Sequence, residues 1–149
     1  MPEKYFTLEE AQELLDYVGP QLKVARDQRR RVEVLERELT AGASRIMLLG
    51  GSIPPIVDLG QKRSERDRLA GELQEAVEKV LETGCLVKDL EMGLVDFPSL
   101  RGGEEIYLCW KLGEEKIQYW HGLTEGYAGR KPLDDSLPEE PPDGPAQIQ

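Results

Sequence analysis

The sequence has few of the residues from which most metal and catalytic sites are built. It contains two cysteines and one histidine, and it has no C-x-x-C pair. Cys85 and Cys109 can form one disulfide at most, and we expect both to be free thiols in a reducing compartment. The spacing of these residues does not predict a structural zinc site.

Long uncharged runs are also missing. The longest, from Ile46 to Val57, is too short to span a bilayer and is interrupted by a Gly-Gly and a Pro-Pro pair. The first residues lack the apolar core of a secretory signal. We therefore expect a cytoplasmic protein with no membrane partner.

Acidic residues outnumber basic ones, 29 to 19, but the charges are distributed unevenly. Residues 23–68 hold eleven basic and seven acidic residues, whereas residues 132–149 hold five acidic residues, no basic residue and five of the ten prolines. The latter segment has too little apolar surface to offset the entropy of ordering it. We expect a single domain over residues 1–131 and a disordered acidic tail over 132–149.

The first half of the domain has the apolar period of helices. A T-x-x-E capping box at Thr7 predicts a helix start, and Gly19-Pro20 predicts a kink or a short break. This helix is expected to end near 40–43. A second helix is expected over about 59–83, ended by Gly84. Two such helices favour an antiparallel hairpin over 7–83 with coiled-coil-like packing and an apolar tip at 46–57.

After Gly84 the apolar period changes to that of strands. Segments 85–90, 94–97, 105–111 and 116–121 predict an antiparallel β-meander of three or four strands over 85–121, followed by a covering segment over 122–131. The fold class is therefore α+β.

Loop lengths predict the register of the meander. A loop at 91–93 places Lys88 opposite Asp96 and Asp89 opposite Val95. A loop at 113–115 predicts two faces, both largely apolar. One packs on the hairpin, and the other needs a cover, either residues 122–133 or a second copy of the protein, so we expect a homodimer. The two faces are Tyr107, Cys109, Tyr119 and His121, and Leu108, Trp110, Gln118 and Trp120.

His121 is the only histidine and could act as a base or a metal ligand. Asp89, Glu91 and Asp96 are the carboxylates that the meander could bring near it. A divalent metal is weakly indicated at His121, Asp89 and Glu91, and no cofactor is predicted. The simpler alternative is a partly buried histidine bonded to a carboxylate or carbonyl.

Other residues have a functional and a structural interpretation. Trp110 and Trp120 could stack a flat ligand or pack in the core. Cys109 could be a nucleophile, although no neighbouring base activates it, or a buried apolar residue. Arg130 follows two glycines and could bind an anion or pair with Asp89 or Asp96.

The basic residues of the hairpin could contact nucleic acid. Acidic residues are interleaved with them, which is typical of solvated helix faces. The basic set is Lys23, Arg26, Arg29, Arg30, Arg31, Lys62, Arg63, Arg66 and Arg68.

Several segments together resemble a bacterial family of uncharacterised proteins, domain-of-unknown-function family 2203. They are residues 6–11, 84–98, 108–114, 120–121 and 129–133. The resemblance implies a bacterial or archaeal cytosolic protein and no particular reaction. Its motif positions fall in the meander and its turns: Lys88, Asp89, Glu91, Gly93, Asp96, Pro98, Cys109, Trp110, Gly113, Glu114, Trp120, His121, Gly129 and Arg130.

The sequence favours a non-enzymatic protein that contacts a protein partner or its own copy through the hairpin and an apolar sheet face. The first alternative is an enzyme with a His/carboxylate site near Arg130, which requires His121 to lie within about 10 Å of a carboxylate because proton transfer needs hydrogen-bond reach. The second is a nucleic-acid-associated factor.

Overall fold

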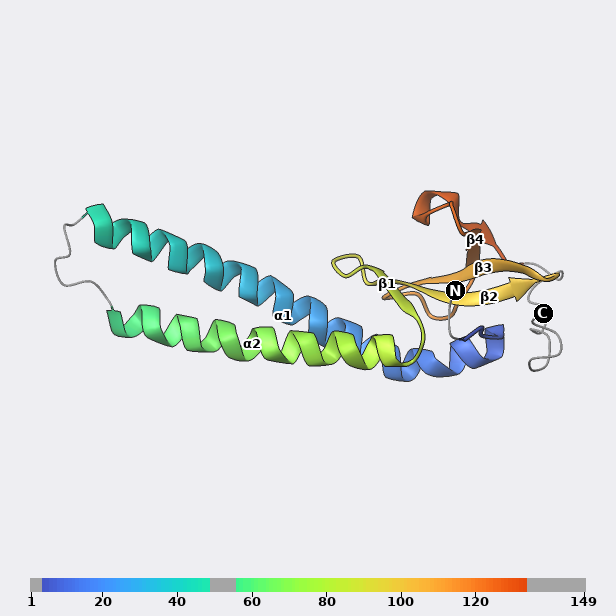
Figure 1. Ribbon diagram of the computed structural model, residues 1–149, viewed down its shortest axis with the longest axis horizontal. Helices are drawn as coiled ribbons and strands as arrows, with labels where there is room; N and C mark the ends of the chain where they lie inside the picture. Colours follow the sequence, from blue (N-terminus) through green and yellow to red (C-terminus); the bar gives the residue numbers. More distant parts are fainter. Residues whose placement is uncertain (1–3, 49–55, 134–149) are drawn as a thin grey trace.

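The computed structural model describes residues 4–48 and 56–133. Two helices, α1 (Leu8–Leu48) and α2 (Ile56–Glu82), form an antiparallel hairpin, and a single antiparallel sheet follows them. Figure 1 shows that the hairpin projects to one side of the sheet, while the first part of α1 lies beneath the strands. The predicted α+β class is confirmed.

The sheet has five strands, in the order in which they occur along the chain. They are β1 (Leu86–Asp89), β2 (Leu94–Arg101), β3 (Glu104–Lys111), β4 (Tyr119–Gly122) and β5 (Lys131–Pro132). The sequence predicted three or four, because a two-residue strand carries almost no periodic signal. A 3₁₀ turn, η1 (Tyr127–Gly129), reverses the chain after β4, so that Lys131 pairs with Trp120.

The expected boundary of the acidic tail changes accordingly. Pro132 belongs to the sheet rather than to the tail, and the Leu133 amide donates to the Gln118 carbonyl at 2.9 Å. The prediction of disorder over the remainder of the tail falls on residues 134–149, which lie outside the described residues.

Both predicted helix signals lie where the structure has helix ends. The Thr7 amide donates to the Glu10 carboxylate at 2.9 Å, and the Glu10 amide donates to the Thr7 hydroxyl at 3.0 Å, which completes the capping box. At the end of α2, Gly84 has φ of +102°, a conformation that glycine adopts without strain. This glycine lets the chain turn from α2 directly into β1.

One expectation for α1 is wrong, because the helix runs to Leu48 rather than ending near 40–43. At Pro20, where a kink or a short break was predicted, the helix is continuous, so the break does not occur. Gly42 lies within the helix and does not end it. Its missing side chain makes room for α2. A Cβ there would lie 2.4 Å from a terminal carbon of Leu59. The remainder of the predicted tip, 49–55, lies outside the described residues.

The expected register of β1 against β2 is also wrong. Leu86, not Lys88, lies opposite Asp96, and the pairing is irregular between Val87 and Asp89. The turn is wider than a three-residue loop because the Asp89 carboxylate accepts a hydrogen bond from the Met92 amide at 2.9 Å. Asp89 is therefore exposed rather than placed among apolar neighbours.

Strand β2 continues four residues beyond the predicted end. The segment with Pro98 looks like a loop in the sequence, but proline is tolerated here because its backbone carbonyl faces Phe6 rather than β3, so the missing amide hydrogen removes no bond between β2 and β3. The Phe6 amide donates to the Pro98 carbonyl at 2.7 Å, and the Ser99 hydroxyl donates to the Phe6 carbonyl at 2.6 Å. These bonds fix the chain immediately before α1 to the sheet.

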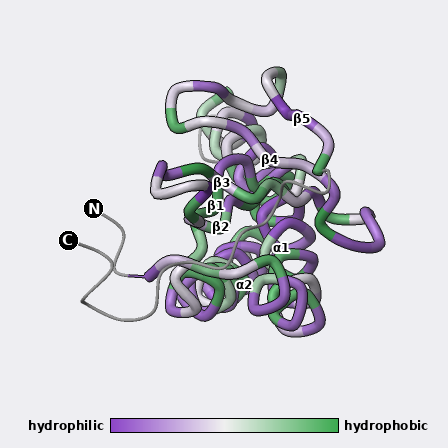
Figure 2. The backbone as a smooth tube through the Cα atoms, turned by 90° about the vertical axis from the view of Figure 1, so that its right-hand side faces the viewer, coloured by the Kyte–Doolittle hydropathy of each residue, from purple (hydrophilic) through white to green (hydrophobic). Residues whose placement is uncertain are grey.

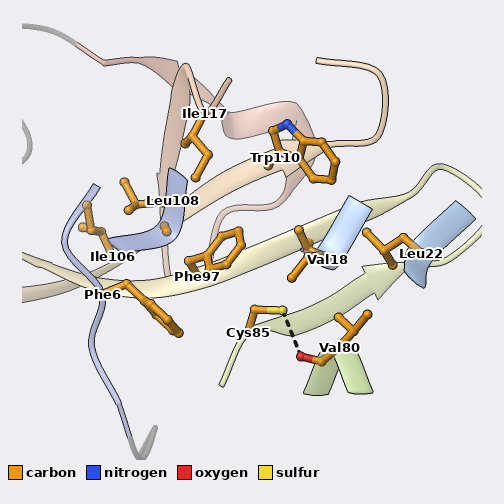
Figure 3. Close-up of a cluster of buried hydrophobic side chains, with 12 residues drawn as sticks. Phe6, Val18, Leu22, Val80, Cys85, Phe97, Ile106, Leu108, Trp110 and Ile117 are labelled. Carbon is orange, nitrogen blue, oxygen red and sulfur yellow. Dashed lines mark hydrogen bonds between the residues drawn. The ribbon is translucent and has the colours of Figure 1, made fainter. Parts of the chain in front are cut away.

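The main core lies between the sheet and the bases of both helices. Figure 3 shows side chains from all of these elements converging in one cluster. Phe6 and Phe97 meet edge to face at its centre, with ring centroids 5.3 Å apart. The twelve buried residues of the cluster are Phe6, Ala11, Val18, Leu22, Val80, Cys85, Val95, Phe97, Ile106, Leu108, Trp110 and Ile117.

The outer hairpin has a smaller apolar cluster and many ion pairs. Val32, Leu35 and Leu69 form the cluster, with Ala70 against it. Seen end on in Figure 2, the helices lie side by side beneath the strands, with hydrophilic and hydrophobic segments alternating along each helix. Among the described residues, no helix is both long and apolar enough to cross a membrane.

Candidate functional site

Five residues of β2, β3 and β4 share one face of the sheet. Across β2 and β3, Asp96 lies opposite Cys109, and across β3 and β4, Tyr107 lies opposite His121 and Cys109 opposite Tyr119. Side chains opposite one another share a face, so these five residues lie on one side of the sheet. The predicted register of strands three and four is therefore confirmed.

On this face, Asp96, Cys109 and His121 form a cluster, which we call the polar triad. Each offers one potential ligand atom, and these atoms all lie within 4.8 Å of one another. The three residues are 1%, 0% and 2% exposed, so the polar triad is sealed from solvent. The Tyr107 ring packs against His121, with the centroids 5.4 Å apart.

The hydrogen bonds of His121 determine what its two ring nitrogens carry. Nδ1 lies 2.8 Å from the Gly122 carbonyl oxygen, which only accepts, so Nδ1 carries a hydrogen and donates it. Nε2 lies 3.0 Å from each carboxylate oxygen of Asp96. If Nε2 carried no hydrogen, its lone pair would repel the Asp96 carboxylate at this distance. The His121–Asp96 pair therefore needs a positive ion between the two groups. Either a proton or a metal ion can supply it.

The thiol of Cys109 is held in its protonated form. Burial, followed by the negative charge of Asp96, raises the pKa of Cys109 to about 12, although the Arg130 guanidinium opposes the shift. A thiol with such a pKa contains almost no thiolate near neutral pH and is a poor nucleophile. The arrangement therefore differs from that of a cysteine activated for catalysis.

Arg130 and Glu114 form a second polar group beside the triad. One terminal guanidinium nitrogen of Arg130 lies 2.8 Å from both carboxylate oxygens of Glu114. The guanidinium carbon also lies 4.0 Å from the ring centroid of Tyr119 and 4.8 Å from that of Tyr127. The segment after β4 thus folds back over this face. Of the two predicted covers, residues 122–133 and a second copy of the protein, the structure has the first.

The carboxylate of Glu114 also organises its own turn. It accepts a hydrogen bond from the Lys111 amide at 2.8 Å, while the Glu114 carbonyl accepts one from the Trp110 indole at 2.9 Å. Arg130 therefore pairs with Glu114 and not with Asp89 or Asp96, the two partners expected from the sequence. Glu114 lies in the turn after β3, which reaches Arg130 more directly than the β1–β2 turn does.

The remaining sequence candidates lie elsewhere. Glu91 is exposed and pairs with Arg30 of α1 at 2.6 Å, and this guanidinium lowers the pKa of Glu91. Asp89 binds its own turn. Trp110 and Trp120 occupy the opposite face of the sheet, where Trp110 is part of the main core. Of the nine candidates, Asp96, Cys109 and His121 converge in the polar triad, and Glu114 and Arg130 pair beside it.

Some residues of this site were not among the candidates named from the sequence. Tyr107 and the Gly122 carbonyl contact His121, and Tyr127 contacts Arg130, but none belongs to a recognisable motif. Tyr107 could have been inferred, because the predicted register already placed it opposite His121. The backbone carbonyl could not, since any residue supplies one.

Comparison with known proteins identifies the family without a reaction. A family model described as an uncharacterized conserved protein, DUF2203, matches residues 4–133, which is most of the chain. The comparisons with curated proteins and with solved structures returned no match. The matched range covers the hairpin, the sheet and the polar triad, and the chain therefore belongs to the uncharacterized conserved protein family DUF2203.

Proposed function

We propose that this protein is a non-enzymatic interaction protein that self-associates through its helical hairpin. The observation that carries the proposal is the apolar end of α1, where Met47 and Leu48 are 82% and 86% exposed. Adjacent large apolar side chains that remain in water favour an interaction surface. They lie at the end of the hairpin farthest from the sheet (Figure 1).

The hairpin is favoured over the sheet as the contact surface. The sequence suggested that an apolar sheet face would also take part, but one face packs on α1 and Phe6, and the segment after β4 covers the other. A second apolar spot lies on α1 instead. Tyr17 and Val24 are 45% and 44% exposed, and their spacing of seven places them on the same side of the helix.

A second copy of the chain is the partner that this surface fits best. Two identical apolar ends can leave water together in a symmetric contact, in which each end covers its counterpart. The hairpins would then pack against one another as an extended helical bundle. A homodimer needs no additional protein, although an unidentified protein partner could use the same surface.

The alternatives have less support. The polar triad is closed to solvent and its thiol is protonated, which disfavours turnover of a substrate. The basic side chains of the hairpin are largely engaged by acidic neighbours, such as Arg31 by Glu65 at 3.2 Å and Lys62 by Asp58 at 3.1 Å. These pairs leave little unopposed positive charge for nucleic acid.

The cellular setting is part of the same proposal. Both cysteines are free, as expected for a reducing compartment, which supports a cytoplasmic location. We also propose a bacterial origin, because the sequence resemblance implies a bacterial or archaeal protein.

Analytical ultracentrifugation over a range of concentrations tests the proposal. We expect a concentration-dependent dimer for the unmodified chain and a monomer for the double variant Met47→Glu/Leu48→Glu, because buried carboxylates would oppose the contact. Leu123→Glu is the matched control, since Leu123 is 48% exposed but lies after β4. A strict monomer, or equal dissociation by the control variant, would contradict the proposal.

A further inference from the structure

The polar triad combines the three ligand types that zinc-class ions prefer. Asp96 on β2, Cys109 on β3 and His121 on β4 offer oxygen, sulfur and nitrogen, with their ligand atoms within 4.8 Å of one another. We propose that these three side chains bind one divalent transition-metal ion of the zinc class. Magnesium and calcium are disfavoured because they prefer sites made of oxygen ligands alone.

The dimensions of the triad suit such an ion. With zinc–ligand bonds of about 2.0–2.3 Å in tetrahedral geometry, neighbouring ligand atoms lie roughly 3.3–3.6 Å apart. The triad brackets this range, since Nε2 of His121 lies 3.0 Å from the Asp96 oxygens and no separation exceeds 4.8 Å. Small shifts of the side chains would bring the three atoms to bonding distance of one ion.

The surroundings of His121 already set the ring for metal binding. Its Nδ1–H donates to the Gly122 carbonyl, so the Nε2 lone pair is directed toward Asp96. A backbone carbonyl in this position is the usual outer partner of a metal-binding histidine, because it fixes both the tautomer and the ring plane.

The charge of the buried site is the same with a proton-bridged and with a metal-bound triad. A bridging proton on His121, a thiol on Cys109 and a carboxylate on Asp96 sum to zero. A neutral imidazole, a thiolate, a carboxylate and a divalent cation also sum to zero. One metal ion thus replaces two protons, one from Nε2 and one from Sγ, and no uncompensated charge is buried.

A metal in this position would act as a structural clamp. The three ligands come from three adjacent strands, so one ion would join β2, β3 and β4 on the face that the covering segment closes. The two oxygens of Asp96 lie equally far from Nε2, so the carboxylate can bind through one or both of them. Asp89 and Glu91, the carboxylates suggested by sequence, lie outside this site.

Cobalt and zinc titrations of the full-length, reduced, chelator-treated protein test the site. We expect one equivalent of Co²⁺ to produce a sulfur-to-cobalt charge-transfer band and the visible bands of four-coordinate cobalt, and Zn²⁺ to displace it. Cys109→Ser should abolish the charge-transfer band and weaken binding by roughly tenfold or more. His121→Gln should weaken binding by a similar factor, because it removes the nitrogen ligand. Cys85→Ser is the matched control, because Cys85 is equally buried but lies outside the triad.

Thermal unfolding keeps the test decisive if a variant folds poorly. Zinc should raise the Tm of the unmodified protein and of Cys85→Ser, but not that of Cys109→Ser, which changes one atom and should retain its circular dichroism spectrum. The proposal is overturned by the absence of metal binding, by a cobalt complex without sulfur ligation, or by equal loss of binding in the Cys85 variant. If no metal binds, a proton is the bridge between His121 and Asp96.

Discussion

The outer hairpin and the base of the molecule are stabilised in different ways. In the outer hairpin, three buried residues and a series of exposed ion pairs join α1 to α2. At the base, twelve buried residues join both helices to the sheet, and a sealed polar triad lies across three strands. Exposed ion pairs contribute little to stability, whereas buried apolar area contributes most of it. The base therefore specifies the fold, and the outer hairpin extends from it.

The largest expected difference between the two regions comes from one substitution made in each. Leu108 at the base and Leu35 in the hairpin are both 0% exposed. Leu→Ala in a core costs about 2–5 kcal/mol, with the high values where neighbours cannot move into the cavity. We expect about 4–5 kcal/mol for Leu108→Ala and about 2 kcal/mol for Leu35→Ala from chemical denaturation.

Hydrogen exchange can measure the effect of each substitution on each region separately. Leu35→Ala should accelerate exchange in the outer halves of α1 and α2 while leaving β2 and β3 protected, because the hairpin can open locally. Leu108→Ala should accelerate exchange throughout the domain. Equal costs and uniform exchange in both variants would show that the molecule unfolds as one unit and that the distinction between the regions is wrong.

The next effect concerns the polar triad in the absence of metal. Asp96→Ala should cost about 3 kcal/mol in a chelator-containing buffer, because it leaves His121 buried without its partner. The double variant with His121→Leu should cost less than the two single changes added together, with a coupling of about 1–3 kcal/mol. Asp89→Ala is the control, since it removes only an exposed turn bond of about 1 kcal/mol or less. Additive costs for Asp96 and His121 would contradict the pairing.

The smallest effect is the dependence of stability on alkaline pH. The Tyr5 hydroxyl donates to the Glu105 carboxylate, and this bond, with burial adding to it, raises the pKa of Tyr5 from 10.0 to about 12. A raised pKa in the fold means that the contribution is complete below pH 10 and is lost as the pH rises to about 12. Tyr5→Phe should therefore lower stability at pH 8, measured by chemical denaturation, and the difference from the unmodified protein should shrink as the pH rises from 10 to about 12.

Glu105→Gln sharpens the alkaline experiment. Removing the carboxylate should return the pKa of Tyr5 toward its usual value, measured by the ultraviolet absorbance of tyrosinate. An unchanged tyrosine titration in this variant would rule out the Tyr5–Glu105 bond as the cause.

Much of this architecture could be predicted from local signals. The capping box at Thr7, the terminating Gly84 and the register that pairs Tyr107 with His121 depend on neighbours in sequence or on one tight loop. These features are set by backbone geometry that a few residues control. The face shared by Cys109 and His121 followed from the same register.

Other features could not be predicted because they depend on distant contacts. The role of Gly42 became apparent only from the approach of Leu59, and the extension of β2 through Pro98 depends on the chain start at Phe6. The sequence named Asp96 with Asp89 and Glu91 as possible neighbours of His121, but the choice of Asp96 depends on the sheet order, because β3 lies between the two strands that carry this pair. The wide β1–β2 turn, closed by Asp89, also displaced the predicted partner of Asp96.

The attachment of the chain start to β2 has a mechanical consequence. Phe6 fixes one leg of the hairpin to the sheet through two hydrogen bonds, and the other leg enters β1 at Gly84. The hairpin is thus attached to the sheet at two points, at β2 through Phe6 and at β1 through Gly84. A sideways force at its far end would act on the strands as shear between β1 and β2. Strand β2, which carries Asp96, would bear part of this force.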